Sequence, residues 1–315
     1  MRYLPLILVV AVACKKPPPA PKGLDESANY MMQNFYANDE IFNAGITGFL
    51  KWYEDEGEAL TGESANLDTV NSYTVGDLSA AAVAHLPLDD KILVDPKDEV
   101  YEKRVVTDAK GVVSLALMDC TWTRAEGYLA RPDQDVVFEK DFEGYERDYL
   151  SSRKVFEDAS SDGEYDPIKD DLLPFEKDFD RDLYAKTLLM TENIVDPTSV
   201  LGANMERFDM NLDLRHGEYE LDGEMVGIAA IITYNIGAAW GSGGSNALLQ
   251  SFSIELNVER PKKQTLRMLT VWAQPKGGGI DPDSAIALNF AVNKALGSSE
   301  RLSDICAGEI VIPKE

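Results

Sequence analysis

The chain has 315 residues, of which 44% are hydrophobic and 27% are charged, enough for one large core or two smaller ones. Its 30 Lys and Arg against 55 Asp and Glu give a formal net charge of −25 at pH 7. This charge argues against a nucleic-acid partner or an anionic membrane surface, because phosphate groups are bound by basic faces. With two His and three Cys, a zinc cage or a conventional metallohydrolase is also unexpected.

The first fourteen residues resemble a bacterial lipoprotein leader. One positive charge at Arg2 precedes an apolar stretch, Leu4 to Ala13, that is too short to span a hydrocarbon core of about 30 Å. The following Ala11-Val12-Ala13-Cys14 resembles a lipobox, in which the cysteine is acylated, for example with palmitate, and becomes the new N-terminus. We therefore expect residues 1–13 to be a signal peptide and Cys14 to be lipidated; an ordinary secretory signal cleaved nearby is the alternative.

Residues 14–23 are rich in proline and lysine and are expected to form a stiff polar tether. The mature chain would then be anchored outside the cytoplasm, in the cell envelope, on the periplasmic face of the outer membrane. In that oxidising compartment Cys120 and Cys306 are expected to form a disulfide. Two buried free thiols are the alternative.

Residues 24–98 are expected to be a helical segment. Asp25 can cap a first helix, and Asp39 a second. The second carries an apolar stripe on one face, made of Phe42, Ile46, Phe49, Leu50 and Tyr53. A third short helix is expected after Asp77, ending before Pro87, and residues 89–98 are expected to be a linker. Periodicity leaves open whether this segment is a separate subdomain or a brace on the main domain.

From about residue 99 the pattern changes to strands separated by turn residues, which predicts an antiparallel meander. In 252–258 the apolar positions alternate with Ser253, Glu255 and Asn257, which indicates one buried and one solvent face. A helix from Ser284 to Cys306 then ends the chain. The expected strands are Val112–Cys120, Arg153–Glu157, Leu183–Thr191, Phe208–Leu214, Met225–Tyr234, Phe252–Val258 and Leu266–Gln274.

One strand, two short helices, a curved meander and a long C-terminal helix resemble the order of the START-like (helix-grip, SRPBCC) superfamily. Residues 132–156, with Asp141-Phe142-Glu143-Gly144-Tyr145, resemble the stretch that carries the two short helices and the second strand. Residues 272–280 resemble the last strand and the Gly-rich bend before the gripping helix. Residues 99–315 are thus expected to be a START-like α+β domain with an acidic insertion at about 157–182.

The resemblance implies that the C-terminal helix lies across the concave face of the sheet and encloses an apolar ligand or lipid. The sequence adds large apolar residues in the relevant elements. They are Met225, Ile228, Ile231, Trp240, Met268, Trp272, Leu288 and Val292. A solid core made by the same residues is the alternative.

One acidic segment matches the front half of an EF-hand calcium loop. Its oxygen ligands would be Asp158, Ser160, Asp162, Glu164 and Asp166. Lys169 stands where the loop needs a bidentate Glu, so we expect a solvated loop that binds calcium no better than millimolar.

Neither histidine stands in a recognisable catalytic pattern, and we expect no enzyme activity and no cofactor. His85 is expected at a helix end and His216 in a turn. The expected function is a lipid-anchored binding protein. The alternative is a non-catalytic structural lipoprotein whose N-terminal helices dock an envelope partner, and an exposed apolar stripe on 39–58 would favour it. A cleft with converging carboxylates of shifted pKa would favour an enzyme.

Overall fold

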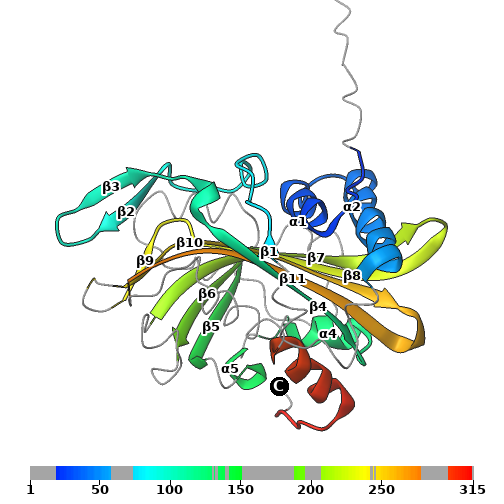
Figure 1. Cartoon of the computed structure of the whole chain (residues 1–315). Helices are drawn as coiled ribbons and strands as arrows, with labels where there is room; N and C mark the ends of the chain where they lie inside the picture. The colour runs from blue at the N-terminus through cyan, green and yellow to red at the C-terminus, as the bar shows by residue number, and fades with distance from the viewer. Residues whose placement is uncertain are drawn as a thin grey trace, which may run out of the picture.

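A computed structural model describes residues 19–57, 74–129, 131, 134–138, 142–150, 188–195, 207–241, 244, 246–277 and 297–313. The protein is α+β, with one large antiparallel sheet and helices on both of its faces (Figure 1). In these ranges no helix is both long and apolar enough to cross a membrane.

The helices divide into an N-terminal pair and a set near the C-terminus (Figure 1). They are α1 (Leu24–Gln33), α2 (Asp39–Trp52) with the π-helical turn η1 (Tyr53–Gly57), α4 (Trp122–Leu129), α5 (Gln134–Val137) and a C-terminal helix, 297–307. The 3-10 turns are η3 (Val106–Asp108) and η5 (Pro261–Lys263). The strands are β1 (Thr74–Val75), β2 (Lys91–Asp95), β3 (Val100–Lys103), β4 (Lys110–Met118), β5 (Phe142–Leu150), β6 (Leu188–Val195), β7 (Arg207–Leu221), β8 (Glu224–Tyr234), β9 (Ala239–Trp240), β10 (Ala247–Arg260) and β11 (Gln264–Lys276).

The strand order in the large sheet is β1-β4-β11-β10-β8-β7-β6-β5, with β9 paired to β10. The meander from β5 to β11 therefore returns to pair its last strand with β4, from which the chain runs into α4 and α5. This order is compatible with a helix-grip fold. Of the expected long C-terminal helix, only 297–307 falls within the described residues, so its full length is not shown.

Several expected elements are wrong or displaced. Residues 80–85 form turns instead of a helix, held by i→i−3 bonds such as Ala82 N–H to the Ser79 carbonyl, 3.0 Å. The expected linker at 89–98 contains β2, because Ile92 is buried against Ala247 and Leu249. The first short helix begins at Trp122, ahead of the 132–156 stretch, whereas α5 and β5 lie within that stretch. The strand expected at 153–157 lies outside the described residues.

One face of the sheet, which we call the core face, is covered by α1 and α2 (Figure 1). Its strand residues interlock with helix residues in one fully buried core. These are Ile254, Leu256, Met268 and Trp272 from the sheet and Phe42, Ile46 and Phe49 from α2. Gly45 allows the two helices to meet, since a Cβ there would lie 2.5 Å from the Met31 sulfur. The N-terminal helices are thus a brace on the sheet, with which they share one core.

Arg215 of β7 fixes the connection between these two helices. Its Nη1 donates to the carbonyls of Phe35 (2.8 Å) and Ala37 (2.7 Å), which follow the end of α1. Its Nη2 donates to Asp39 Oδ1 at the start of α2, 2.7 Å away. The guanidinium also lies 3.8 Å from the centre of the Phe42 ring, a cation–π contact. A buried cation is tolerated here because backbone carbonyls, a carboxylate and an aromatic face surround it.

The opposite face of the sheet carries α4 and the C-terminal helix (Figure 1). A disulfide joins Cys120, just after β4, to Cys306 in that helix, with 5.3 Å between the Cα atoms. Arg124 of α4 adds a bond from Nη1 to the Cys306 carbonyl, 2.8 Å. The helix ends in a Schellman motif, in which Gly308 takes φ +81° and Glu309 N–H donates to the Asp304 carbonyl. The end of the chain is therefore held firmly against the sheet.

Candidate functional site

The face beneath the C-terminal helix, which we call the polar face, is the candidate site. In an antiparallel sheet, residues that are directly opposite share a face. Asn257 lies opposite both Ala229 and Arg267, and Ala229 in turn lies opposite His216. The neighbouring row places Glu255 opposite Ile231. Polar side chains from β7, β10 and β11 thus share the middle of this face.

This polar face is buried, although the alternation in β10 predicts a solvent face. The exposed fractions are 8% for Ser253 and Glu255 and 0% for Asn257. The C-terminal helix reaches this surface, as its bonds to Arg267 show. The prediction that this face is exposed to solvent was wrong. The alternation of residue types identifies which residues share a face, but it does not show whether another element covers that face.

Arg267 is the centre of a group that we call the polar cluster, formed with Glu255, Asn257, Ser298 and Ser299. Its Nε and Nη2 donate to the two oxygens of Glu255 at 2.8 and 3.1 Å, a bidentate pair. Its Nη1 donates to the hydroxyls of Ser298 (2.7 Å) and Ser299 (2.6 Å). Asn257 Nδ2 also donates to Glu255, at 2.9 Å. The cluster joins two neighbouring strands to the start of the described part of the C-terminal helix.

His216 adds a second polar contact on this face. It lies within β7, and its Nδ1 is 3.1 Å from Glu126 Oε1 of α4, with the histidine side chain 11% and the glutamate side chain 14% exposed. The expectation that His216 is a turn residue was wrong, because β7 runs on through His216-Gly217 to Leu221. The contact positions α4 over the sheet. Trp122 of α4 lies over Gly227, where a Cβ would come within 2.0 Å of its indole nitrogen.

Beside the polar cluster lies an apolar patch. Leu212, Leu214 and Ile231 of the sheet pack with Leu302 of the C-terminal helix, and all four are buried. In the next row of the sheet, beside Leu212, Thr233 and Ser253 share a hydroxyl–hydroxyl bond of 2.6 Å. The face below the helix is therefore amphipathic, apolar around Leu212, Leu214 and Ile231 and polar around Arg267.

The eight residues expected to line a cavity do not lie around one space. Ile228, Met268 and Trp272 belong to the core face, packed with the N-terminal helices. Ile231 lies on the polar face, packed with Leu212, Leu214 and Leu302. Trp240 packs beside the β2–β3 hairpin and donates from Nε1 to the Leu93 carbonyl, 3.1 Å. Met225 is 58% exposed. The expected set failed because it mixed odd and even positions of β8, which point to opposite faces.

The remaining expected site residues lie outside the described residues. They are Leu288, Val292, the lipidation site Cys14 and the calcium candidates Asp158, Ser160, Asp162, Glu164 and Asp166.

Of the expected apolar stripe, Phe42, Ile46, Phe49 and Tyr53 are buried in the core and Leu50 is partly buried against it. The exposed apolar stripe that would have favoured a docking role for this helix is therefore not seen in α2.

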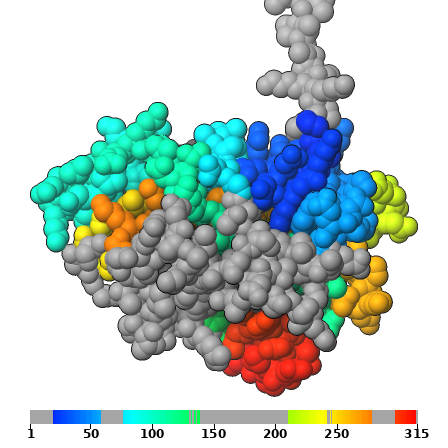
Figure 2. All heavy atoms as spheres, in the orientation of Figure 1, coloured from blue at the N-terminus to red at the C-terminus, as the bar shows by residue number. Residues whose placement is uncertain are grey.

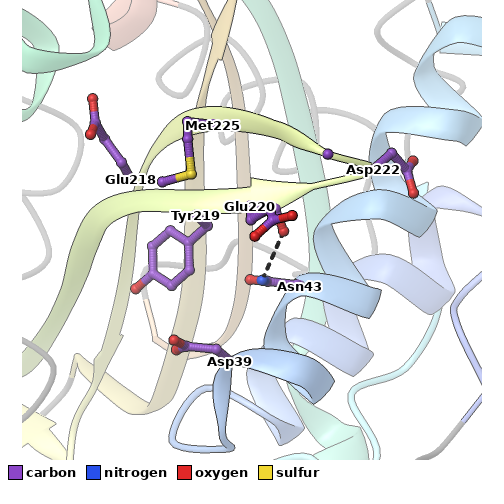
Figure 3. A pocket seen from close by; sticks show the side chains of 8 residues that line it. Asp39, Asn43, Glu218, Tyr219, Glu220, Asp222 and Met225 are labelled. Atoms are coloured by element: carbon purple, nitrogen blue, oxygen red, sulfur yellow. Dashed lines mark hydrogen bonds between the residues drawn. The ribbon is translucent and has the colours of Figure 1, made fainter.

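A pocket of about 470 Å³ opens between the start of α2 and the β7–β8 hairpin (Figure 3). It is lined by Asp39, Asn43, Glu218, Tyr219, Glu220, Asp222, Gly223 and Met225. Asn43 spans it by donating to the Glu220 carbonyl at 3.3 Å, and Asp39 is held by Arg215. Glu218 and Asp222 lie at opposite ends of the view in Figure 3. In the part of the chain that the structure describes, no group of three or more His, Cys, Asp or Glu could hold a metal ion.

Asp213 is the described carboxyl with a strongly shifted pKa. It lies in β7 opposite Ile232, on the core face, and is 2% exposed. Burial raises the pKa of this carboxyl well above its ordinary value. Because Asp213 lies inside the core and not in a cleft, its shift does not support an enzyme.

Neither a known protein family nor a curated protein matches the sequence. Among solved structures, the chain is similar to Ara h 8.0201, a helix-grip protein of the Bet v 1 fold. The identity is 9%, the match covers 63% of this chain and 97% of that chain, and the TM-score is 0.30. A TM-score this low carries no argument, so the compatibility with a helix-grip fold rests on the strand order described above.

Proposed function

We propose that this protein is a lipid-anchored extracytoplasmic binding protein that holds an amphipathic ligand, such as a lipid, between the polar face of its sheet and its C-terminal helix. The fold would be a START-like helix grip, with the helix continuing N-terminally from residue 297. The protein would be tethered through Cys14 to the periplasmic face of the outer membrane.

Two observations support the location. The leader ends in a lipobox-like sequence followed by a proline-rich tether. The Cys120–Cys306 disulfide is the second, because disulfides persist in oxidising compartments such as the periplasm and are rare in the cytosol.

The ligand site is supported chiefly by the unlike composition of the two buried faces. The core face is packed mostly with aromatic and aliphatic side chains, although β7 also buries Asp213 and Arg215 on it. The polar face buries a charged pair, an amide and several hydroxyls next to apolar side chains. Replacing a buried ion pair by apolar residues is often neutral or stabilising, so stability alone gives little reason to retain one.

The arrangement also indicates the kind of ligand. The apolar patch formed by Leu212, Leu214, Ile231 and Leu302 would contact a hydrocarbon part. The polar cluster would set the position of a polar end through the dipoles and hydroxyls that surround Arg267. A wholly apolar ligand would make no hydrogen bond with the polar cluster. We therefore favour an amphipathic ligand, whose polar end can lie beside that cluster.

Native mass spectrometry of the detergent-extracted protein tests this proposal. The wild-type protein should carry a co-purified lipid mass. Arg267→Met combined with Glu255→Leu removes the charged pair without leaving a lone buried charge, and should reduce the lipid-bound fraction while the protein stays folded. The matched control is Lys51→Gln with Asp55→Asn, which removes an exposed pair on α2 and η1. Folded wild-type protein that carries no lipid would contradict the proposal.

A further inference from the structure

Asn257 of the polar cluster buries an oxygen that has no hydrogen-bond partner in the described part of the chain. The residue is 0% exposed. Its Nδ2 donates to Glu255 Oε1 at 2.9 Å, which fixes the orientation of the amide, because the nitrogen is the end that can donate to a carboxylate. The unpartnered atom is therefore Oδ1, an acceptor that is turned away from Glu255.

The neighbouring strands do not supply this oxygen with a donor. Asn257 lies opposite Arg267 on one side and Ala229 on the other. The guanidinium of Arg267 already donates to a carboxylate and to two serine hydroxyls, and the side chain of alanine has no donor. A buried acceptor without a partner costs free energy comparable to a lost hydrogen bond, so the position calls for a partner from outside the described residues.

An unpartnered oxygen is not by itself evidence of a ligand, since Thr270 buries another one on the core face. Two features distinguish Asn257. Its amide is fixed by the bond to Glu255, whereas a threonine hydroxyl is free to rotate. Its face also buries a second unpartnered oxygen, that of Ser114, which is 3% exposed and lies in the same cross-strand row as Glu255.

The oxygen lies on the side of the sheet that the C-terminal helix covers. Ser298 and Ser299 at the start of the described part of that helix are bonded to Arg267, the cross-strand neighbour of Asn257. Figure 2 shows this end of the chain, in red, on the opposite side of the molecule from α1 and α2, in blue. Asn257 Oδ1 therefore belongs to the proposed ligand face and not to the core that the sheet shares with the N-terminal helices.

We infer that Asn257 Oδ1 accepts a hydrogen bond from the polar end of the bound lipid, so that the protein selects lipids whose polar end carries an N–H or O–H donor. This inference rests on the proposed function, which places the ligand on this face. A primary ammonium or a hydroxyl satisfies the oxygen. A quaternary ammonium does not, because it has no N–H. Arg267 gives the face no net positive charge that would select an anion instead, because Glu255 pairs with it in a bidentate way.

The test compares phospholipids that differ only in the head group. Phosphatidylethanolamine carries a primary ammonium and phosphatidylglycerol carries hydroxyls, whereas the quaternary ammonium of phosphatidylcholine has no N–H. The detergent-extracted full chain is incubated with an equimolar mixture of the three dioleoyl lipids, and the bound lipids are counted by native mass spectrometry. We expect the ethanolamine or the glycerol lipid to be preferred about tenfold over the choline lipid, the effect of one added hydrogen bond. Which of the two is preferred identifies the donor as an ammonium or a hydroxyl.

Two variants assign the preference to Asn257. Asn257→Leu keeps the size of the side chain, removes the acceptor and leaves the Arg267–Glu255 pair in place, and it should bind the three lipids to the same extent. Thr270→Val is the matched control, because it removes an equally buried, unpartnered oxygen from the core face. It should keep the preference of the wild-type protein.

Equal binding of the three lipids by the wild-type protein would overturn the inference and leave the binding function in place. A preference that persists in folded Asn257→Leu would also overturn it, because another group would then select the head group. If Asn257→Leu does not fold, the wild-type comparison still decides whether a donor is selected. Wild-type protein that binds none of the lipids would instead overturn the proposed function, and the inference with it.

Discussion

The two faces of the sheet are both buried, yet they are built from different chemistry. On the core face, side chains such as Phe252, Ile254 and Trp272 interlock with α1 and α2, and the charged groups buried there, Asp213 and Arg215, lie on β7. On the polar face, Ser253, Glu255 and Asn257 of the same strand β10 are equally inaccessible to solvent. Burial therefore does not distinguish a stabilising core from a candidate site in this protein. The types of side chain that are buried do distinguish them, and the difference is visible along the single strand β10.

The largest loss of stability is expected from the core face. Phe42→Ala removes a fully buried ring that also lies against the Arg215 guanidinium. The free energy of unfolding should fall by about 3–5 kcal/mol, as for other buried Phe→Ala substitutions. Urea unfolding measures it. Tyr101→Ala, at an exposed position, is the control and should change stability by no more than about 0.5 kcal/mol.

On the polar face, the loss of stability should depend on whether one or both members of the Arg267–Glu255 pair are replaced. Arg267→Met leaves the Glu255 carboxylate buried without its bidentate partner, which should cost about 3–5 kcal/mol. Arg267→Met together with Glu255→Leu should recover most of that loss, because no lone charge remains. Thermal unfolding of the single and double variants checks this. If the double variant is as unstable as the single one, the pair is needed for packing and the distinction between the faces weakens.

Removing the disulfide should lower the free energy of unfolding by less than Phe42→Ala or Arg267→Met does. Cys120→Ser with Cys306→Ser opens a link between residues 186 apart in sequence. We expect a loss of about 2–4 kcal/mol, because the unfolded chain gains freedom. Urea unfolding under oxidising conditions measures it, with reduced wild-type protein as the comparison. A loss below 1 kcal/mol would mean that the bonds of Arg124 and the polar cluster hold the C-terminal helix without the link.

The smallest effect is a change in pH dependence, on the core face. The folded protein keeps Asp213 protonated to a higher pH than the unfolded chain does, since burial raises its pKa. Its contribution to stability is therefore present below the ordinary Asp pKa of 3.8, and is lost as the pH rises through the raised folded value. Asp213→Asn should remove the fall of stability between pH 3.8 and the raised folded pKa. Parallel curves for the two proteins would show that Asp213 does not titrate this way.

The sequence predicts the sheet better than it predicts the site. Strict alternation in 252–258 correctly separates Ile254 and Leu256 from Glu255 and Asn257, because the pleat fixes which side chains share a face. The compartment expected from the leader and the count of remaining cysteines also point to the pair seen in the structure. These features depend on local geometry or on counting, which one sequence is enough to provide.

The polar cluster was missed because its members are distant in the sequence and individually ordinary. Glu255 in an alternating strand is typical of a solvated face, and Arg267 is one charged residue in a mostly apolar strand. Their significance appears only once β10 and β11 pair and Ser298 and Ser299 are brought above them. One signal was available: an acidic and a basic residue in adjacent strands of a predicted hairpin. It was not used because the face that carries them was expected to be exposed to solvent.

Photo-crosslinking with a diazirine-bearing phospholipid tests the proposed binding face most directly, because it distinguishes the two faces without any mutation. The lipid is bound to the detergent-extracted protein and irradiated, and the modified residues are identified by peptide mass spectrometry. We predict adducts on polar-face residues around Leu212, Leu214, Ile231 and Leu302. Adducts on Ile228, Met268 or Trp272 of the core face, or adducts confined to exposed residues, would contradict the account.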